Sequence, residues 1–187
     1  MQMGHLRAKN VGAKKLLVKS KPAFLVDSML GSVARKLRFF GFDTIYVVNS
    51  PDNEIISFGM NHDRFILTCD KDMYKRIVKA RAQGTLLKGS DDLEDISNTF
   101  LSYGTLLGQY MDVNSRCSVC NGLLAEKSHA EIAEKINVKI KNRQKQFFQC
   151  KRCYKIYWEG SHYIRLMELA KRIDCRILER LKTLTRF

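Results

Sequence analysis

The sequence has no uninterrupted apolar run of the roughly 18 residues that a membrane-spanning helix requires. Residues 1–15 likewise lack the apolar stretch of a secretory signal, so we expect a cytoplasmic protein with no membrane partner. Acidic residues are also few, because 19 Asp and Glu stand against 33 Lys and Arg, which gives a net charge of +14. This imbalance points to a polyanionic partner, and to nucleic acid first.

Apolar residues, in contrast, are abundant enough to exclude a disordered chain, since 45% of the 187 residues are hydrophobic. This length suits one domain of ordinary size and a small module. The net charge is +6 over residues 1–21, −2 over 22–113, +6 over 114–162 and +4 over 163–187. We therefore divide the chain into a basic N-terminal arm, a nearly neutral domain, a small basic module and a basic C-terminal segment over these four ranges. The alternative is ordinary solvated charge without a partner.

The almost neutral segment alternates short apolar runs with amphipathic stretches, which is typical of βαβ units. Strands are predicted at residues 23–26, 44–48, 65–68 and 84–87. Helices are predicted at residues 28–40, from residue 51, at 71–81, and from 91 into the region of 104–108. The pattern favours a doubly wound parallel sheet of strand order 2-1-3-4, with helices on both faces.

Acidic residues fall where these strands end and the next helices begin. Asp27 follows the first strand, Asp52 and Glu54 open the helix after the second, and Asp70 and Asp72 follow the third. In the 2-1-3-4 order the first and third strands are neighbours, so we expect Asp27 and Asp70 to face each other across the ligand-binding crevice. Clustered carboxylates are best neutralised by a divalent cation, and oxygen ligands favour Mg or Mn. The alternative is that each carboxylate caps a helix or complements its dipole.

The chain then resembles a known family in five stretches. These are FLVDSMLGSVARKLRFFGFDT (24–44), PDNEII (51–56), RFILTCDKD (64–72), CSVCNGLL (117–124) and YWEGSH (157–162). Together they are similar to the PIN-like family named for the C-terminal RNase domain of Mut-seven, over roughly residues 24–167. The resemblance implies a PIN-type α/β nuclease fold with an attached zinc ribbon. It also implies that Asp27, Asp52 or Glu54, Asp70 and Asp72 hold a catalytic divalent metal. Cys69 stands where the family usually has Arg before the Asp.

Four of the six cysteines form two Cys-x-x-Cys pairs, Cys117 with Cys120 and Cys150 with Cys153. Two such knuckles complete a tetrahedral four-sulfur site, so we predict one structural zinc ion per chain. The chain between the pairs must make an excursion, and alternation over residues 137–140 suggests a strand there. Cys69 and Cys175 lie in apolar contexts and are predicted to be buried, inert thiols.

Two further patterns bear on binding. Residues 163–184 form an amphipathic helix with an apolar stripe and a basic face. The stripe contains Leu166, Ala170, Ile173, Ile177, Leu181 and Leu184, and the basic face contains Arg165, Lys171, Arg172, Arg176 and Arg180. In the ribbon, aromatic residues alternate with cations. The cations can contact phosphates, and the aromatic residues can either stack unpaired bases or form the module's core. The aromatic residues are Phe147, Phe148, Tyr154, Tyr157 and Trp158, and the cations are Lys145, Lys151, Arg152 and Lys155.

These patterns support two hypotheses about function. The first is a metal-dependent ribonuclease in which the ribbon and the basic ends bind RNA and the acidic crevice cleaves it. The second is a non-catalytic RNA-binding protein that uses the same fold as a scaffold, with ribosomal RNA or the ribosome as its partner. A toxin of a toxin–antitoxin pair would fit the PIN resemblance but would leave the ribbon unexplained.

Overall fold

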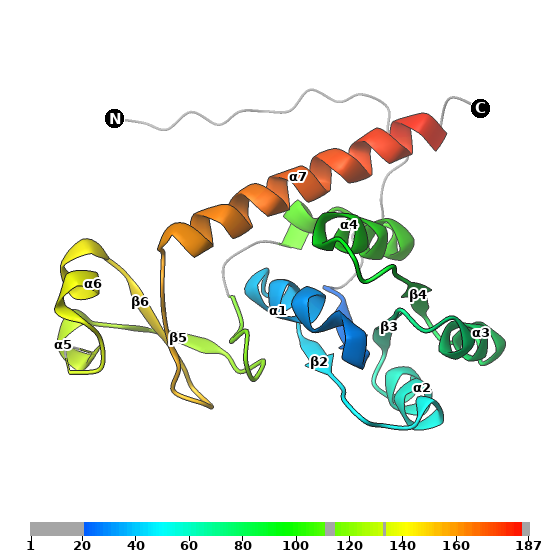
Figure 1. Ribbon diagram of the computed structural model, residues 1–187, viewed down its shortest axis with the longest axis horizontal. Coiled ribbons are helices and arrows are strands. Elements are labelled where there is room, and N and C mark those ends of the chain that lie inside the picture. The colour runs from blue at the N-terminus through cyan, green and yellow to red at the C-terminus, as the bar shows by residue number, and fades with distance from the viewer. Residues whose placement is uncertain (1–20, 111–114, 133, 185–187) are drawn as a thin grey trace.

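The computed structural model describes residues 21–110, 115–132 and 134–184. The predicted N-terminal arm lies outside these residues except for Lys21. The described chain forms a four-stranded and a three-stranded sheet with flanking helices (Figure 1).

The larger sheet is parallel throughout and has the strand order β2-β1-β3-β4, which confirms the predicted topology. Its strands are β1 (Ala23–Val26), β2 (Thr44–Tyr46), β3 (Arg64–Thr68) and β4 (Gly84–Leu86). The predicted strand starts and ends differ from these by at most two residues. Because β1 and β3 are neighbours, the carboxyl ends of both strands open at the same edge of the sheet.

Helices cover both faces of this sheet (Figure 1). They are α1 (Gly31–Phe39), which follows the 3-10 helix η1 (Ser28–Leu30), α2 (Asp52–Asn61), α3 (Lys71–Lys79) and α4 (Asp92–Tyr103). Successive residues of β1 point to opposite faces: Phe24 packs in the core beneath α1 and α4, and Leu25 packs with Ile55 of α2 and Ile77 of α3. The near-continuous apolar strands of the sequence therefore match a sheet that is buried on both sides.

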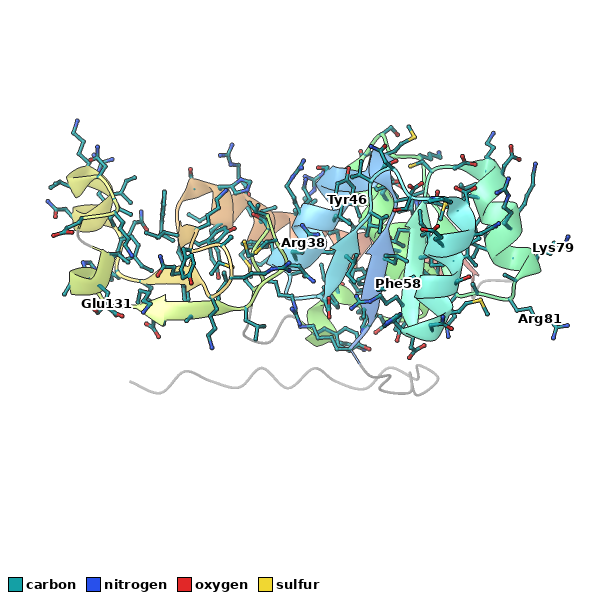
Figure 2. All side chains as sticks on the ribbon, turned by 90° about the horizontal axis from the view of Figure 1, so that it is seen from below. Arg38, Tyr46, Phe58, Lys79, Arg81 and Glu131 are labelled. Carbon is teal, nitrogen blue, oxygen red and sulfur yellow. The ribbon has the colours of Figure 1, made fainter. Side chains whose placement is uncertain are left out.

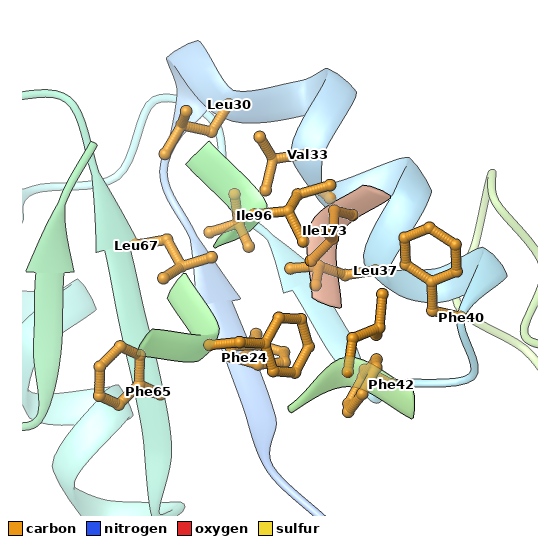
Figure 3. Packing of buried hydrophobic residues seen from close by; sticks show 14 of the residues in the cluster. Phe24, Leu30, Val33, Leu37, Phe40, Phe42, Phe65, Leu67, Ile96 and Ile173 are labelled. Carbon is orange, nitrogen blue, oxygen red and sulfur yellow. The ribbon is translucent and has the colours of Figure 1, made fainter. Parts of the chain in front are cut away.

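Phe24 lies at the centre of an aromatic cluster in the larger core (Figure 3). Its ring is fully buried, and its centroid lies 5.5 Å from Phe42, 6.0 Å from Phe100 and 6.4 Å from Phe65. All three pairs have an edge-to-face arrangement, which aromatic rings prefer to a direct face-to-face stack. The cluster joins β1, β3 and α4 into one body.

The C-terminal helix α7 (Ser161–Leu184) packs along α4 and the 3-10 helix η2 (Leu107–Tyr110) (Figure 1). Ala170, Ile173 and Ile177 are buried in the larger core, which confirms the predicted amphipathic helix. Asp174 accepts hydrogen bonds from the backbone N–H groups of Leu107, at 2.8 Å, and Gly108, at 2.9 Å. Among the described residues no helix is both long and apolar enough to span a membrane.

Two residues of the basic face of α7 form ion pairs within the protein. Arg176 and Arg180 both pair with Glu94 of α4, and Arg180 also donates to Asn98. Cys175 is exposed, so its predicted burial is wrong. Its position, two residues after Ile173, turns it by about 200° from the buried stripe on a helix.

The smaller sheet is antiparallel with the strand order β5-β6-β7 and belongs to what we call the cysteine module, residues 115–132 and 134–158. Its elements are β5 (Leu124–Lys127), α5 (His129–Ile132), α6 (Val138–Arg143), β6 (Phe147–Cys150) and β7 (Ile156–Trp158). The strand predicted at residues 137–140 is wrong, because Asn137 caps the start of α6 by accepting the N–H of Lys139 at 2.9 Å. Val138 is 67% exposed, so the alternation there does not mark a buried face.

Candidate functional site

Two of the predicted acidic residues meet at the carboxyl edge of the parallel sheet. The buried hydroxyl of Thr68, the last residue of β3, donates to Asp27 Oδ2 at 2.9 Å. The same hydroxyl oxygen accepts the backbone N–H of Asp70 at 3.0 Å. The Thr68 hydroxyl therefore links the side chain of Asp27 to the backbone of Asp70 where β1 and β3 end.

Asp70 also caps α3, as the alternative interpretation of the sequence expected. Its Oδ1 atom accepts the backbone N–H groups of Asp72 at 2.6 Å and Met73 at 2.9 Å. Its Oδ2 atom has no hydrogen-bond partner among the described residues, and the side chain is exposed. One carboxylate oxygen of Asp70 is thus held by the helix and the other is open to a ligand.

The other three predicted acidic residues have different surroundings. Asp52 pairs with Arg76 of α3 at 3.2 Å, and Asp72 pairs with Lys75 at 2.7 Å on the surface. The hydrogen bond from Lys75, together with its charge, lowers the pKa of Asp72. Glu54 lies in the first turn of α2 and lines an apolar hollow beside β2. Asp27 and Asp70 are therefore linked through Thr68, whereas Asp52 and Asp72 each form an ion pair with a basic side chain.

Asp95 of α4 is an acidic residue at this edge that sequence reasoning did not select. It is buried and accepts the backbone N–H groups of Lys88 and Gly89, each at 2.9 Å. Burial raises the pKa of Asp95 despite these hydrogen bonds. Cys69 is partly buried, and burial raises the pKa of its thiol, as do the negative charges of Asp95 and Asp27.

Asp92 is a second acidic residue at this edge that sequence reasoning did not select. Its Oδ2 atom accepts hydrogen bonds from Ser32 at 3.0 Å and Lys36 at 2.6 Å, both on α1. The acidic residues clustered at 91–95, a few positions after the fourth strand, are the sequence signal that would have identified both Asp92 and Asp95. Tyr46, at the carboxyl end of β2, lies at the same edge (Figure 2) and donates to the carbonyl oxygen of Ser28.

The four cysteines of the predicted zinc site come together. The sulfur atoms of Cys117, Cys120, Cys150 and Cys153 all lie within 4.8 Å of one another. Cys117 is 3.4 Å from Cys153, and Cys120 is 3.4 Å from Cys150. Four sulfurs bound to a tetrahedral zinc at about 2.3 Å would lie about 3.8 Å apart, so this geometry is compatible with zinc. Among the described residues this is the one group of three or more Cys, His, Asp or Glu that can hold a metal ion.

The first Cys-x-x-Cys loop is closed by two backbone hydrogen bonds. The N–H of Cys117 donates to the carbonyl of Gly122 at 2.8 Å, and the N–H of Asn121 donates to the carbonyl of Cys117 at 2.9 Å. A Cβ atom on Gly122 would lie 2.8 Å from Cys150 Sγ and 3.0 Å from Arg152 Cβ. Glycine at this position lets the two loops approach closely enough to bring their sulfurs together.

The second loop repeats the same pattern. The N–H of Cys150 donates to the carbonyl of Lys155 at 2.9 Å, and the N–H of Tyr154 donates to the carbonyl of Cys150 at 3.1 Å. The N–H groups of Arg152 and Cys153 point at Cys150 Sγ, at 3.3 Å and 3.4 Å. Such donors stabilise the thiolate that a metal ion requires.

Cys117 is also surrounded by groups that favour its thiolate. Burial disfavours the charged form, but hydrogen bonds from the Tyr157 hydroxyl, at 3.0 Å, and from the backbone of Cys120 and Val119 outweigh burial. Together they lower the pKa of Cys117 to about 6. A lower pKa favours the thiolate form of Cys117, which is the form that binds a metal ion.

Arg38 joins the cysteine module to the α/β part of the chain (Figure 2). This buried side chain of α1 donates from Nε to the carbonyl of Thr44 at 2.9 Å. Its NH1 group donates to the carbonyls of Ser118 and Val119, each at 3.1 Å, inside the first cysteine loop. Burial lowers the pKa of Arg38, although nearby anionic groups oppose that effect.

Asn121 makes a second connection from the same loop. Its side chain accepts the backbone N–H of Thr44 at 3.1 Å and donates to Asp43 at 2.8 Å. Asp43 also pairs with Arg64 at 3.2 Å. Burial disfavours the charge of Asp43, but hydrogen bonds from Arg64 and Asn121 outweigh burial and lower its pKa. The first cysteine loop thus docks on the start of β2.

The chain is therefore an α/β protein with carboxylates at the carboxyl edge of a parallel sheet and a cysteine group that can hold a metal ion. A family model, the Mut7-C RNAse domain, matches residues 22–170. The chain belongs to this family, which indicates a nuclease-type, RNA-related function. No curated protein and no solved structure gave a match.

Proposed function

We propose that this protein is a metal-dependent ribonuclease whose acidic site lies between the carboxyl ends of β1 and β3. The observation that carries the proposal is the attachment of Asp27 and Asp70 to Thr68 in a chain of an RNase family. Magnesium is usually held by one or two carboxylates, with water and substrate phosphate oxygens completing its shell, and this pair fits that requirement. A bound Mg or Mn ion supplies an activated water and stabilises charge on the leaving oxygen.

Within this proposal the protein side chains have distinct roles. Thr68 orients Asp27, and the α3 amides fix the Asp70 carboxylate so that Oδ2 points outward as a ligand. Asp52, Glu54 and Asp72 complete the site or orient water. Because Asp52 and Asp72 are paired with Arg76 and Lys75, their participation requires those ion pairs to open.

The cysteine group is proposed to hold one structural zinc ion in a zinc ribbon. Four sulfur ligands close the coordination shell and leave no position for a reacting water, so this metal supports the fold. Cys150→Ser removes one ligand, and freshly purified variant protein should contain less zinc than the wild type by elemental analysis. Wild-type protein without zinc would overturn the assignment.

The test of the ribonuclease proposal is cleavage of single-stranded and structured RNA with added Mg or Mn. Asp27→Asn and Asp70→Asn should abolish cleavage while RNA affinity stays equal or rises, because each variant removes a negative charge near the phosphates. Asn caps a helix about as well as Asp, so Asp70→Asn should keep its stability, whereas Asp70→Ala should lose about 1 kcal/mol.

Asp63→Asn is the matched control for these variants. Asp63 precedes β3 at the opposite edge of the sheet, is exposed and has a φ of 48°, which Asn tolerates. This variant removes the same charge and should cleave RNA like the wild type. Wild-type protein that cleaves no RNA with either metal but sediments with ribosomes would favour the non-catalytic RNA-binding alternative.

A further inference from the structure

Tyr154 occupies a position that neither packing nor backbone preference explains. It follows the second Cys-x-x-Cys pair with a φ of 61°, in the left-handed region that tyrosine rarely adopts. Its side chain is 70% exposed, the largest exposure of any aromatic side chain among the described residues. A bulky apolar ring is thus held in water on a backbone conformation that disfavours it. Strained, exposed residues of this kind occur at binding sites.

The first cysteine loop provides an internal comparison. Asn121 occupies the equivalent position with a φ of 65°, and Asn is a residue type that tolerates this conformation. Its side chain is used to dock the loop on Asp43 and Thr44. Among the described residues the ring of Tyr154 has no such partner, so the same backbone turn presents an aromatic face on the second loop.

Hydrogen bonds fix both the backbone N–H and the backbone carbonyl of Tyr154. The N–H of Tyr154 donates to the carbonyl of Cys150 at 3.1 Å, and its carbonyl accepts the side-chain amide of the buried Gln149 at 2.9 Å. A platform fixed in this way loses little conformational entropy when a flat ligand stacks on it.

The surroundings of Tyr154 are cationic. Lys151, Arg152 and Lys155 are exposed on the same loop, and within the described part of the chain none of them forms an ion pair with a carboxylate. Lys155 instead lies over the ring of Tyr157, at 5.8 Å from its centroid. Exposed cations around an aromatic ring complement a ligand that has both a planar face and a negative charge. An unpaired nucleotide in a single-stranded RNA segment meets both conditions.

We propose that Tyr154 is a stacking platform for one unpaired RNA base, with Lys151, Arg152 and Lys155 holding the adjoining phosphates. This inference rests on the proposed function and adds the substrate class, because a base in a duplex is already stacked and cannot use the ring. The second cysteine loop is therefore a single-strand binding site separate from the acidic edge of the sheet.

The experiment measures binding of the full chain to a single-stranded oligoadenylate and to a duplex of equal length, without added Mg or Mn. Tyr154→Asn, which copies the first loop, should weaken single-strand binding between about 5-fold and about 150-fold, the range for losing one base–aromatic stack. Tyr154→Phe keeps the ring and should bind like the wild type. Duplex affinity should be the same for all three proteins. A fluorescent adenine analogue in the oligonucleotide should be quenched by wild type and Tyr154→Phe only.

Folding and charge are checked separately. Tyr154→Asn relieves the backbone strain, so its Tm should equal or exceed that of the wild type, and its metal content should be unchanged. Lys155→Gln should lower affinity and reduce the log–log salt slope by about 1, as expected for one lost phosphate contact.

Three outcomes would overturn the inference. In the first, Tyr154→Asn binds the single strand with the affinity of the wild type. In the second, Tyr154→Asn weakens binding to the duplex as much as binding to the single strand. If either occurs while the wild type still cleaves RNA, the ribonuclease proposal stands and the platform fails. The third is a wild type that neither binds nor cleaves RNA, in which case both proposals fail.

Discussion

The contact of Asn121 with Asp43 and Thr44 allows a sharp test of how the cysteine module is attached. Asn121→Gly keeps the left-handed backbone, because glycine adopts a φ of 65° without strain, and it removes only the side chain. Two hydrogen bonds are then lost, at 3.1 Å to the buried Thr44 N–H and at 2.8 Å to the Asp43 carboxylate.

The expected cost follows from these two bonds. A buried N–H left without an acceptor costs about 1–3 kcal/mol, and a hydrogen bond to a charged group contributes about 1.5–3 kcal/mol. Asp43 retains Arg64 and is partly exposed, so we expect a total of about 2–4 kcal/mol. For a chain of this size that lowers Tm by roughly 5–15 °C. Asn121→Ala should lose a further 1–2 kcal/mol or so, because alanine is strained at this φ.

The assay is thermal unfolding at several pH values, with Asn49→Gly as the matched control. Asn49 has a φ of 57°, is exposed and makes no side-chain hydrogen bond among the described residues, so its change should stay within about 0.5 kcal/mol. The folded-state pKa of Asp43 is lowered, so its stabilising effect is fully present above its unfolded value of 3.8 and is lost as the pH falls through the folded pKa. The gap between wild type and Asn121→Gly should therefore be constant at neutral pH and narrow below 3.8. A variant as stable as the wild type at neutral pH would refute the reasoning.

Three further predictions concern packing and the metal. Gly122→Ala places a Cβ atom 2.8 Å from Cys150 Sγ and should weaken retention of the proposed zinc ion in a chelator competition assay. Phe24→Ala empties the centre of the aromatic cluster and should cost about 3–5 kcal/mol in urea unfolding, whereas a change below 1 kcal/mol or so would contradict the packing described. Ile173→Ala should cost about 2–5 kcal/mol because this side chain is fully buried between α7 and the core, and an unchanged midpoint would show that α7 docks by other contacts.

Much of the fold was predictable because its signals are local. Each strand of the parallel sheet is a short apolar run, and α3 and α4 begin at the capping residues Asp70 and Asp91, so much of the element order followed from neighbouring residues. The strand order 2-1-3-4 followed from the doubly wound class of sheet rather than from individual residues, and the structure has this order. The helix α6 was missed because four alternating residues do not distinguish a strand from a helix. The prediction for Cys175 was wrong because it rested on apolar neighbours and not on its angle on the helix, which places it about 200° from the buried Ile173.

The acidic residues at the carboxyl edge of the parallel sheet were also only partly predictable from the sequence. The positions of Asp27 and Asp70 after two neighbouring strands were readable from the sequence, but their shared contact with Thr68 was not. Asp95 was missed although it lies among the acidic residues clustered at 91–95, because its burial and its hydrogen bonds to Lys88 and Gly89 arise only when the β4–α4 turn closes.

The attachment of the cysteine module shows most clearly what the sequence alone determined and what needed the tertiary structure. The two Cys-x-x-Cys spacings were sufficient to predict a four-sulfur site, because each pair is a local turn whose chemistry its own residues define. The contacts of Arg38 with Ser118 and of Asn121 with Asp43 join residues 80 and 78 positions apart. No local preference encodes such pairs, since they form only when packing of the sheet, α1 and the first cysteine loop brings distant backbone groups within hydrogen-bond distance.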